Sequence, residues 1–250
     1  MLTSLRNARL AYHRRLIVLV GPSDENVKVA VKIIGRYIEY FKCSNLSAVY
    51  SYHRFFEDGV SRREFFSELI SKYKDRISIE YVPYPETNKI LGRTYDIAVI
   101  DLMNDLKPND LGRLVGLVKG GGFLIIFLPA FNEFYKMITR FQQNLVTIGY
   151  TSSDVRHIFK KRFVRKIFEH PGIIVYDTKR KIFLKEEEVR EVPRYVRRKP
   201  VIPPKTKFPK RVYELALTQD QVEVLSILEN LYQKLEEDEK VAVVITADRG

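Results

Sequence analysis

The segments expected between residues 218 and 250 follow the order that precedes the phosphate-binding loop in many nucleotide-binding proteins. A polar tetrad, Thr218-Gln219-Asp220-Gln221, precedes a segment with helical periodicity, which is followed by the apolar run VAVVITADRG. This order of polar tetrad, amphipathic helix and buried strand is typical of P-loop ATPases, in which a glutamine before the helix can read adenine. Thr218 and Gln221 also fit a capping box, S/T-x-x-E/Q, which stabilises a helix start without any ligand. Both interpretations can hold at once.

Three other motifs could bind phosphate or a metal, and each has a simpler explanation. Gly21-Pro22-Ser23 follows the first apolar run but lacks both G-K-[ST] and G-x-G-x-x-G, so a plain strand-to-helix turn is favoured. Asp101 ends another apolar run, where a magnesium-binding carboxylate would stand. Without a P-loop beside it, a surface or helix-capping aspartate is favoured. Gly120-Gly121-Gly122 would let a nucleotide approach the backbone closely, and a tight turn into a strand explains it as well.

The histidines and the cysteine give no sign of a metal site. His13, His53, His157 and His170 are not paired at the i,i+3 or i,i+4 spacing of helical ligands. The single cysteine, Cys43, excludes an internal disulfide and a cysteine-rich zinc site, and it is expected to be a small buried apolar residue. No Ser/His/Asp set can be assembled from the sequence. We therefore predict no metal ligand and no catalytic residue in this chain.

Basic side chains are concentrated in the middle of the chain. The formal net charge is +12, and the segments 1–150, 151–210 and 211–250 carry +6, +11 and −5. Residues 152–168 are expected to form a helix whose basic side chains lie largely off its apolar stripe. That stripe comprises Val155, Ile158, Phe159, Phe163 and Ile167.

A basic helix of this kind, followed by a basic proline-rich linker, suits a phosphate backbone. The contact would not depend on nucleotide sequence, because phosphates are alike at every position. RNA or DNA is the first polyanion to consider and an acidic membrane surface the second, while an ordinary solvated surface remains the alternative. The predicted RNA-binding residues are Arg156, Lys160, Lys161, Arg165, Lys166, Arg194, Arg197, Arg198 and Lys199.

The pattern of apolar runs predicts an α/β fold of the Rossmann-like, parallel-sheet type. Near-continuous apolar strands alternate with amphipathic helices, as expected when both faces of a parallel sheet are covered. Strands are expected at 15–21, 46–52, 77–82, 95–102 and 120–129, and a hairpin pairs 172–177 with 181–185. Helices are expected from about 23 to 41, at 61–73, at 108–118, from about 130 to 145, and at 152–168 and 217–237.

Four segments are expected along the chain. Residues 1–150 would form the Rossmann-like domain, and residues 151–190 would complete it with the basic helix and the hairpin. Residues 191–211 contain five prolines and few apolar side chains, so they are expected to form an extended linker. Residues 212–250 would begin a second domain with one helix and one strand.

Four stretches of this sequence resemble the N-terminal part of the RNA cytidine N4-acetyltransferases, which modify tRNA(Met) and rRNA. They are RRLIVLVG; ILGRTYDIAVIDLMNDLKPNDLGRLVGLVKGGGFLIIFLP; RHIFKKRFVRKIFEHPGIIVYDTKRKIFL; and LTQDQVEVLSILENL with VAVVITADRG. The second and third are long and specific, and the resemblance covers essentially the whole chain. It implies that residues 212–250 begin a RecA-like helicase domain.

The resemblance also implies cofactors and partners. In that family TADRG continues to a phosphate-binding lysine, so Gln221, Ala247, Asp248, Arg249 and Gly250 would be part of an ATP site. ATP with magnesium and acetyl-CoA would serve the full-length enzyme, and the remaining helicase and GNAT-type domains would be partners. This chain alone is expected to be inactive, to fold as a scaffold with an RNA-contact surface, and to bind neither cofactor fully. Whether it forms a homo-oligomer stays open.

Two alternatives of other classes stay open from the residues alone. One is a stand-alone nucleic-acid-binding or ribosome-assembly module. The other is a SAM-dependent methyltransferase, against which the absence of G-x-G-x-G after the first strand counts. The longest apolar runs are of strand length and no signal peptide is recognised, so we expect a cytoplasmic protein without a membrane partner.

Overall fold

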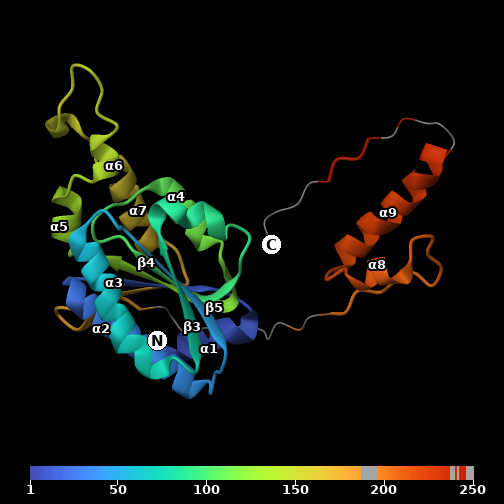
Figure 1. Cartoon of the computed structure of the whole chain (residues 1–250), viewed down its shortest axis with the longest axis horizontal. Coiled ribbons are helices and arrows are strands. Elements are labelled where there is room, and N and C mark those ends of the chain that lie inside the picture. Colours follow the sequence, from blue (N-terminus) through green and yellow to red (C-terminus); the bar gives the residue numbers. More distant parts are fainter. Residues whose placement is uncertain (187–195, 197, 237–239, 241, 246–250) are drawn as a thin grey trace. The chain divides into compact units, whose positions relative to one another are not determined.

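The computed structural model describes residues 1–186, 196, 198–236, 240 and 242–245. The chain divides into two compact units, Met1–Tyr195 and Val196–Gly250, which are drawn together in Figure 1. The finer boundaries expected at residues 150, 190 and 211 stay predictions.

The first unit is built on a seven-stranded sheet with the order β3-β2-β4-β5-β1-β6-β7. Strands β1 to β6 run parallel to one another, and β7 is antiparallel to β6, which confirms both the α/β prediction and the hairpin. The strands are β1 (Arg15–Val20), β2 (Leu46–Tyr52), β3 (Ile77–Pro83), β4 (Tyr95–Asp101), β5 (Val118–Leu128), β6 (Ile173–Asp177) and β7 (Ile182–Lys185).

Helices cover both faces of this sheet, because successive side chains of a strand point to opposite faces. In β1, Ile17 and Leu19 join the apolar cluster on one face, whereas Val18 and Val20 join the cluster on the other. The first face is covered by α1 (Leu2–Ala11), α2 (Ser23–Tyr40) and α3 (Glu57–Ile70). The second is covered by η2 (Tyr84–Ile90), α4 (Pro108–Val115), α5 (Phe131–Lys136) and α7 (Ile158–Glu169).

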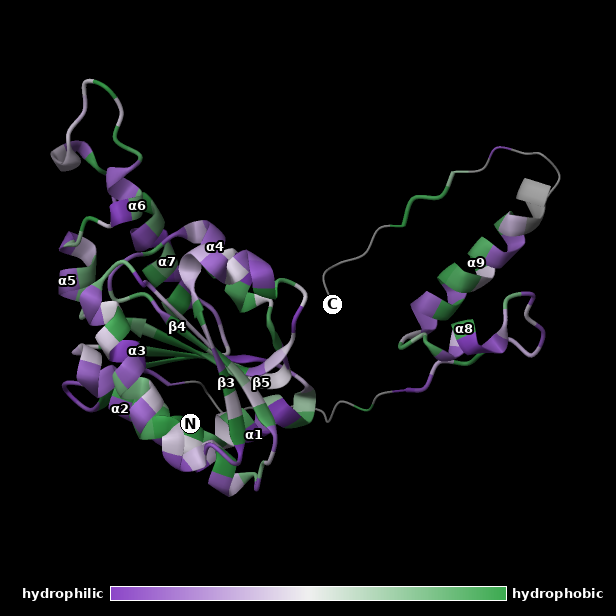
Figure 2. Cartoon of the chain, in the orientation of Figure 1, coloured by the Kyte–Doolittle hydropathy of each residue, from purple (hydrophilic) through white to green (hydrophobic). Residues whose placement is uncertain are grey.

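Three short helices complete the first unit: η1 (Ser71–Tyr73), α6 (Arg140–Gln143) and η3 (Ser152–Asp154). Figure 2 shows hydrophobic residues concentrated in the strands and mixed with polar residues around the helices. Continuous burial of the central strands explains why their sequences are apolar without alternation.

The second unit contains α8 (Lys210–Glu214) and α9 (Gln219–Glu236). Tyr213 of α8 is fully buried, and its hydroxyl donates to Glu229 Oε2 of α9 at 3.1 Å. The backbone N–H of Phe208 donates to the other carboxylate oxygen of Glu229. A buried carboxylate with two donors therefore ties the segment before α8 and α8 itself to α9.

The helix expected between about 130 and 145 is wrong as a continuous element. It divides into α5 and α6, because Met137 has extended backbone angles (φ −61°, ψ 126°). A new helix, α6, then begins after Thr139. The Thr139 hydroxyl accepts from the Gln142 N–H, and the Gln142 side chain accepts from the Thr139 N–H. This capping box favours a new helix over continuation of the old one.

Other expected boundaries also move. The helix expected at 61–73 begins earlier, at Glu57, and the helix expected at 152–168 begins only at Ile158. Helix α1 was not expected at all. The strand expected near the carboxyl end is wrong where the structure describes it, since residues 242–245 have no strand conformation. A strand needs a hydrogen-bonded neighbour, and no strand within the described part of the chain pairs with these residues.

Candidate functional site

Helix α7 presents a basic face to solvent. Lys161 and Arg165 are exposed, and Lys166 is half-buried. Glu169, one turn further on, accepts from Lys166 Nζ at 2.6 Å and lies 3.4 Å from Arg165 Nε, and its pKa is lowered by Lys166 first. Arg156, just before the helix, is also exposed. One carboxylate thus faces two of these four cations, so the face stays positively charged.

Lys160 is a correction to the predicted RNA-binding set. Its side chain is only 2% exposed, and its ammonium donates to the carbonyl oxygens of Phe134, at 2.8 Å, and of Met137. Met137 caps the carboxyl end of α5, where helical carbonyls lack partners within the helix. Burial lowers the pKa of Lys160. Lys160 therefore holds α7 against α5 and cannot contact a phosphate.

The buried stripe of α7 also differs from the predicted one. It contains Lys160, Val164 and Ile167, whereas Ile158 is 67% exposed and Phe159 40% exposed. Of the predicted linker residues, Arg198 and Lys199 are exposed, while Arg194 and Arg197 lie outside the described residues. The structure therefore brings together only the cations of α7 and its approach.

Gln221 forms the capping box that its spacing predicts. Its Oε1 accepts from the N–H groups of Leu217, at 2.5 Å, and Thr218, at 3.3 Å, and its own N–H donates to Thr218 Oγ1 at 3.4 Å. The remaining residues of the predicted ATP site, Ala247, Asp248, Arg249 and Gly250, lie outside the described residues. The predicted contact of Gln221 with adenine stays a prediction.

The turn after β1 is a closed strand-to-helix connection, as favoured from the sequence. A Cβ placed on Gly21, whose φ is +142°, would lie 2.6 Å from Thr178 Oγ1. Thr178 Oγ1 donates to Asn26 Oδ1 at 2.8 Å, and Asn26 Nδ2 donates to Leu128 O at 3.1 Å. Side chains from α2 and from the end of β6 therefore fill the place where a dinucleotide phosphate sits in a Rossmann fold.

Asp101 is neither a surface residue nor a helix cap. It is 1% exposed and accepts from Arg62 Nε of α3 at 2.7 Å. The three glycines lie within β5, where a Cβ on Gly120 would be 2.3 Å from the Tyr12 ring. Gly120 and Gly121 permit close packing of the end of α1 on the sheet, and Gly122 lies close to the Asp96 carbonyl of β4, so packing rather than ligand binding explains these glycines.

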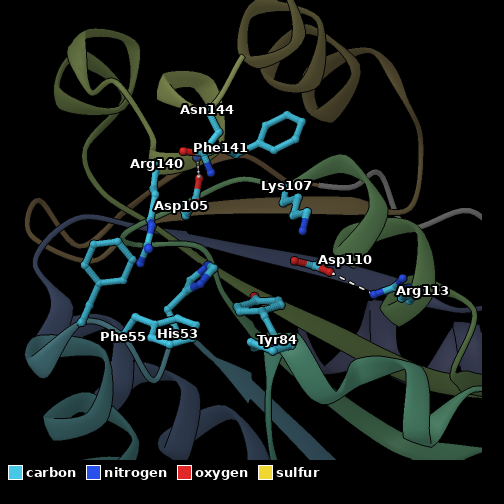
Figure 3. Close-up of a pocket in the computed structure, with 12 residues that line it drawn as sticks. His53, Phe55, Tyr84, Asp105, Lys107, Asp110, Arg113, Arg140, Phe141 and Asn144 are labelled. Carbon is cyan, nitrogen blue, oxygen red and sulfur yellow. Dashed lines mark hydrogen bonds and ion pairs between the residues drawn. The ribbon is translucent and has the colours of Figure 1, made fainter. Parts of the chain in front are cut away.

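A pocket of about 340 Å³ opens beyond the carboxyl ends of β2, β3 and β4 (Figure 3). His53 follows β2, Tyr84 follows β3, and Asp105 follows β4. Three parallel strands therefore place one residue each at the carboxyl edge of the sheet. The α4 region contributes Lys107, Asp110 and Arg113. The α6 region contributes Arg140, Phe141 and Asn144.

The inner part of this pocket is buried and polar. His53, Asp105 and Asp110 are 8%, 6% and 5% exposed. Burial lowers the pKa of His53 against the opposing effect of Asp105, and burial raises the pKa of Asp110. The ring of His53 lies on that of Tyr84, with centroids 4.2 Å apart. A neutral imidazole can donate from one nitrogen and accept at the other, which suits recognition of a polar ligand.

The order of the sheet explains why this pocket is hard to recognise in the sequence. His53, Tyr84 and Asp105 each follow a strand, which is the position where α/β proteins hold ligands. That signal was present for His53 and Asp105, but only the strand order β3-β2-β4 brings them together. Among the described residues no cluster of His, Cys, Asp or Glu is placed to hold a metal ion.

Comparison with known proteins gives the family. Residues 1–178 match the family described as "tRNA(Met) cytidine acetyltransferase TmcA, N-terminal". The chain belongs to this family. The match confirms the resemblance drawn from the sequence and favours the acetyltransferase interpretation over the methyltransferase one.

Relatives of the TmcA family align with nearly the whole chain. A protein named tRNA(Met) cytidine acetyltransferase TmcA from Thermofilum pendens is 44% identical over 98% of this chain, which corresponds to 30% of the relative. The protein of the same name from Pyrococcus abyssi is 37% identical over 99% of this chain and 32% of the relative. The chain thus spans about a third of the length of these relatives. No helix in the described part of the chain is long and apolar enough to span a membrane.

Proposed function

We propose that this chain is the N-terminal part of an ATP-dependent, acetyl-CoA-using RNA cytidine N4-acetyltransferase, and that it serves as a scaffold that contacts RNA. The RNA contact is inferred from the basic face of α7, which is formed by Lys161, Arg165 and Lys166. The names of the relatives supply the substrate class, because they are tRNA(Met) cytidine acetyltransferases. The protein would act on tRNA in the cytoplasm.

The charge distribution supports this role. The segment that contains α7 has most of the excess positive charge, +11 within residues 151–210. Counterion release from neutralised phosphates gives such a surface affinity for any RNA backbone. Arg156, Arg198 and Lys199, all exposed, would add contacts of the same kind.

ATP and acetyl-CoA would be bound elsewhere in the longer protein. Gln221, with Ala247, Asp248, Arg249 and Gly250, would contribute to the ATP site once the phosphate-binding lysine follows. Because Gln221 Oε1 is engaged in the capping box, its amide nitrogen is the group left to contact adenine. Neither cofactor is expected to bind fully to this chain alone.

A stand-alone nucleic-acid-binding module is the second candidate, and the same basic face favours it. The two candidates use the same surface and differ in whether the protein acetylates RNA. Acetylation of cytidine in tRNA by the longer protein, and its loss on removal of the acetyltransferase region, would distinguish the first from the second.

The RNA contact is tested by reversing the charge of α7. The variant Lys161→Glu/Arg165→Glu/Lys166→Glu should bind tRNA more weakly, and the salt dependence of log K should become less steep by about three, near one per lost phosphate contact. Binding is measured by filter retention at several salt concentrations.

A matched variant controls for the change in net charge. Lys28, Lys32 and Arg36 are exposed at four-residue steps on α2, which covers the opposite face of the sheet. Lys28→Glu/Lys32→Glu/Arg36→Glu changes the net charge by the same amount. If it weakens tRNA binding as much as the α7 variant does, the basic face of α7 has no special role and the proposal is wrong.

A further inference from the structure

The pocket at the ends of β2, β3 and β4 holds a polar atom that lacks a partner. His53 is 8% exposed, and its Nε2 is buried without a hydrogen bond to any described residue. Figure 3 shows the imidazole directed into the hollow between Phe55 and Tyr84. A buried polar atom without a partner costs free energy, so a polar group that enters the pocket, a water molecule or a ligand atom, would be stabilised by bonding to it.

The inner and outer parts of the pocket differ in character. Inside, Asp105 and Asp110 provide carboxyl groups that can accept from amino or hydroxyl groups. At the rim, Lys107 and Arg140 are exposed, and neither forms an ion pair with another described residue. A ligand with hydrogen-bonding groups at one end and a negative charge at the other matches this arrangement.

Aromatic rings border the same space. Phe55 is 61% exposed, and the Arg140 guanidinium lies 5.3 Å from the centre of its ring. Phe141, in α6, lines the wall of the pocket. Exposed aromatic rings beside arginine are stacking surfaces for nucleobases.

The pocket also lies where the fold sends helices to opposite sides of the sheet. Helix α3, which follows β2, packs on one face, and α4, which follows the neighbouring strand β4, packs on the other. In open α/β sheets the crevice at such a divergence, beyond the carboxyl ends of the strands, is where ligands bind. The turn after β1 is closed by Thr178 and Asn26, whereas the pocket at the ends of β2, β3 and β4 is open.

We propose that this pocket binds a nucleotide. The base stacks on Phe55 or Phe141 and hydrogen-bonds His53 and the buried carboxyl groups, while Arg140 and Lys107 hold the phosphate. The nucleotide is either free in solution or one unit of a single-stranded RNA, since both offer the same base and phosphate. The site does not depend on the proposed role of α7.

The test is calorimetric titration of the full 250-residue chain. The probes are AMP, ADP and CMP, a single-stranded hexaribonucleotide, and inorganic phosphate. At least one nucleotide probe should bind, and Arg140→Ala should weaken that binding about tenfold to a hundredfold, the range for loss of one charged hydrogen bond. His53→Leu should weaken it about tenfold. Arg36→Ala, which removes an exposed arginine of α2, should bind as the wild type does.

The outcomes separate the two sources of the ligand. Tight mononucleotide binding that the hexamer does not exceed indicates a free nucleotide, and binding of the hexamer alone indicates a unit of RNA. The proposal is wrong if no probe binds at millimolar concentration or if phosphate competes as well as the nucleotides do. It is also wrong if Arg140→Ala, an exposed change that should not affect folding, leaves the affinity unchanged. Mononucleotide affinity should survive the α7 charge reversal, so failure of one proposal is distinguishable from failure of the other.

Discussion

The guanidinium of Arg62 donates from Nε to Asp101 Oδ2 at 2.7 Å, and the two side chains are 3% and 1% exposed. Arg62 lies on α3 and Asp101 ends β4, so the pair joins a helix to the carboxyl edge of the sheet. Arg62 also bonds Asp58 and Asn104, and the Tyr84 hydroxyl donates to the Asp101 carbonyl at 2.9 Å. This network forms the structural base beneath the pocket.

Breaking this pair should be strongly destabilising. Arg62→Met leaves a buried carboxylate without its charge partner, so we expect a loss of about 3–5 kcal/mol in the free energy of unfolding. Urea denaturation followed by circular dichroism measures it. Replacing both partners, Arg62→Met with Asp101→Leu, should cost less than the sum of the two single changes.

An exposed pair provides the comparison for that loss. Arg93 lies 2.8 Å from Glu80, and both side chains are exposed. Arg93→Met should cost much less stability than Arg62→Met does, because solvent screens surface ion pairs. Equal losses at Arg62 and Arg93 would contradict the structural role assigned to the buried pair.

Lys160 and Lys161 are adjacent lysines with opposite roles. Lys160→Met removes an ammonium from the carbonyls of Phe134 and Met137, so it should lower the stability by about 1–3 kcal/mol. Lys161→Met changes an exposed side chain and should alter stability by less than about 0.5 kcal/mol. Thermal denaturation and tRNA binding are measured on both. Only Lys161→Met should reduce the salt dependence of binding, and the reverse pattern would show that the two residues are misassigned.

The architecture was predictable because the burial of a strand or helix determines its pattern of apolar residues. Strands covered on both faces must be apolar throughout, as in LIVLV and IAVI, and the helices between them must be amphipathic. The capping box of Thr218 and Gln221 was predictable for a similar reason, since its two partners are three residues apart.

Features that depend on distant partners were not predictable from one sequence. Lys160 resembles its exposed neighbours, and only the end of α5 shows that it is buried. Asp101 resembles a surface aspartate until Arg62, from another element, is placed beside it. The pocket depends on the strand order β3-β2-β4, which amino-acid patterns do not specify. Local periodicity thus predicts elements, whereas tertiary contacts decide which side chains are available to ligands.

Close packing at Gly120 gives a third prediction. A Cβ there would lie 2.3 Å from the Tyr12 ring and 2.6 Å from the Tyr12 carbonyl oxygen, so Gly120→Ala should lose about 1–3 kcal/mol of stability. Gly112, in α4, has open space around its Cβ position, and Gly112→Ala should gain up to about 1 kcal/mol from helix propensity. Urea denaturation compares the two. Equal effects would contradict the packing of Tyr12 on β5.

The last prediction concerns stability in mild acid. Burial lowers the pKa of His53, against the opposing effects of Asp105, Asp101 and Asp110, which all lie nearby. As the pH falls through the ordinary histidine pKa of about 6.5, the unfolded chain takes up a proton before the folded chain does. Stability should therefore decrease between pH 7.5 and 5, and it should decrease less in His53→Gln. Urea denaturation at pH 8.5, 7.5, 6 and 5 measures the difference. Above pH 7.5 the free energies of unfolding of the wild type and the variant should differ by a constant amount, because the imidazole is neutral in both the folded and the unfolded state. Parallel curves down to pH 5 would show that His53 titrates as an exposed histidine does, and that the inner part of the pocket is open to water.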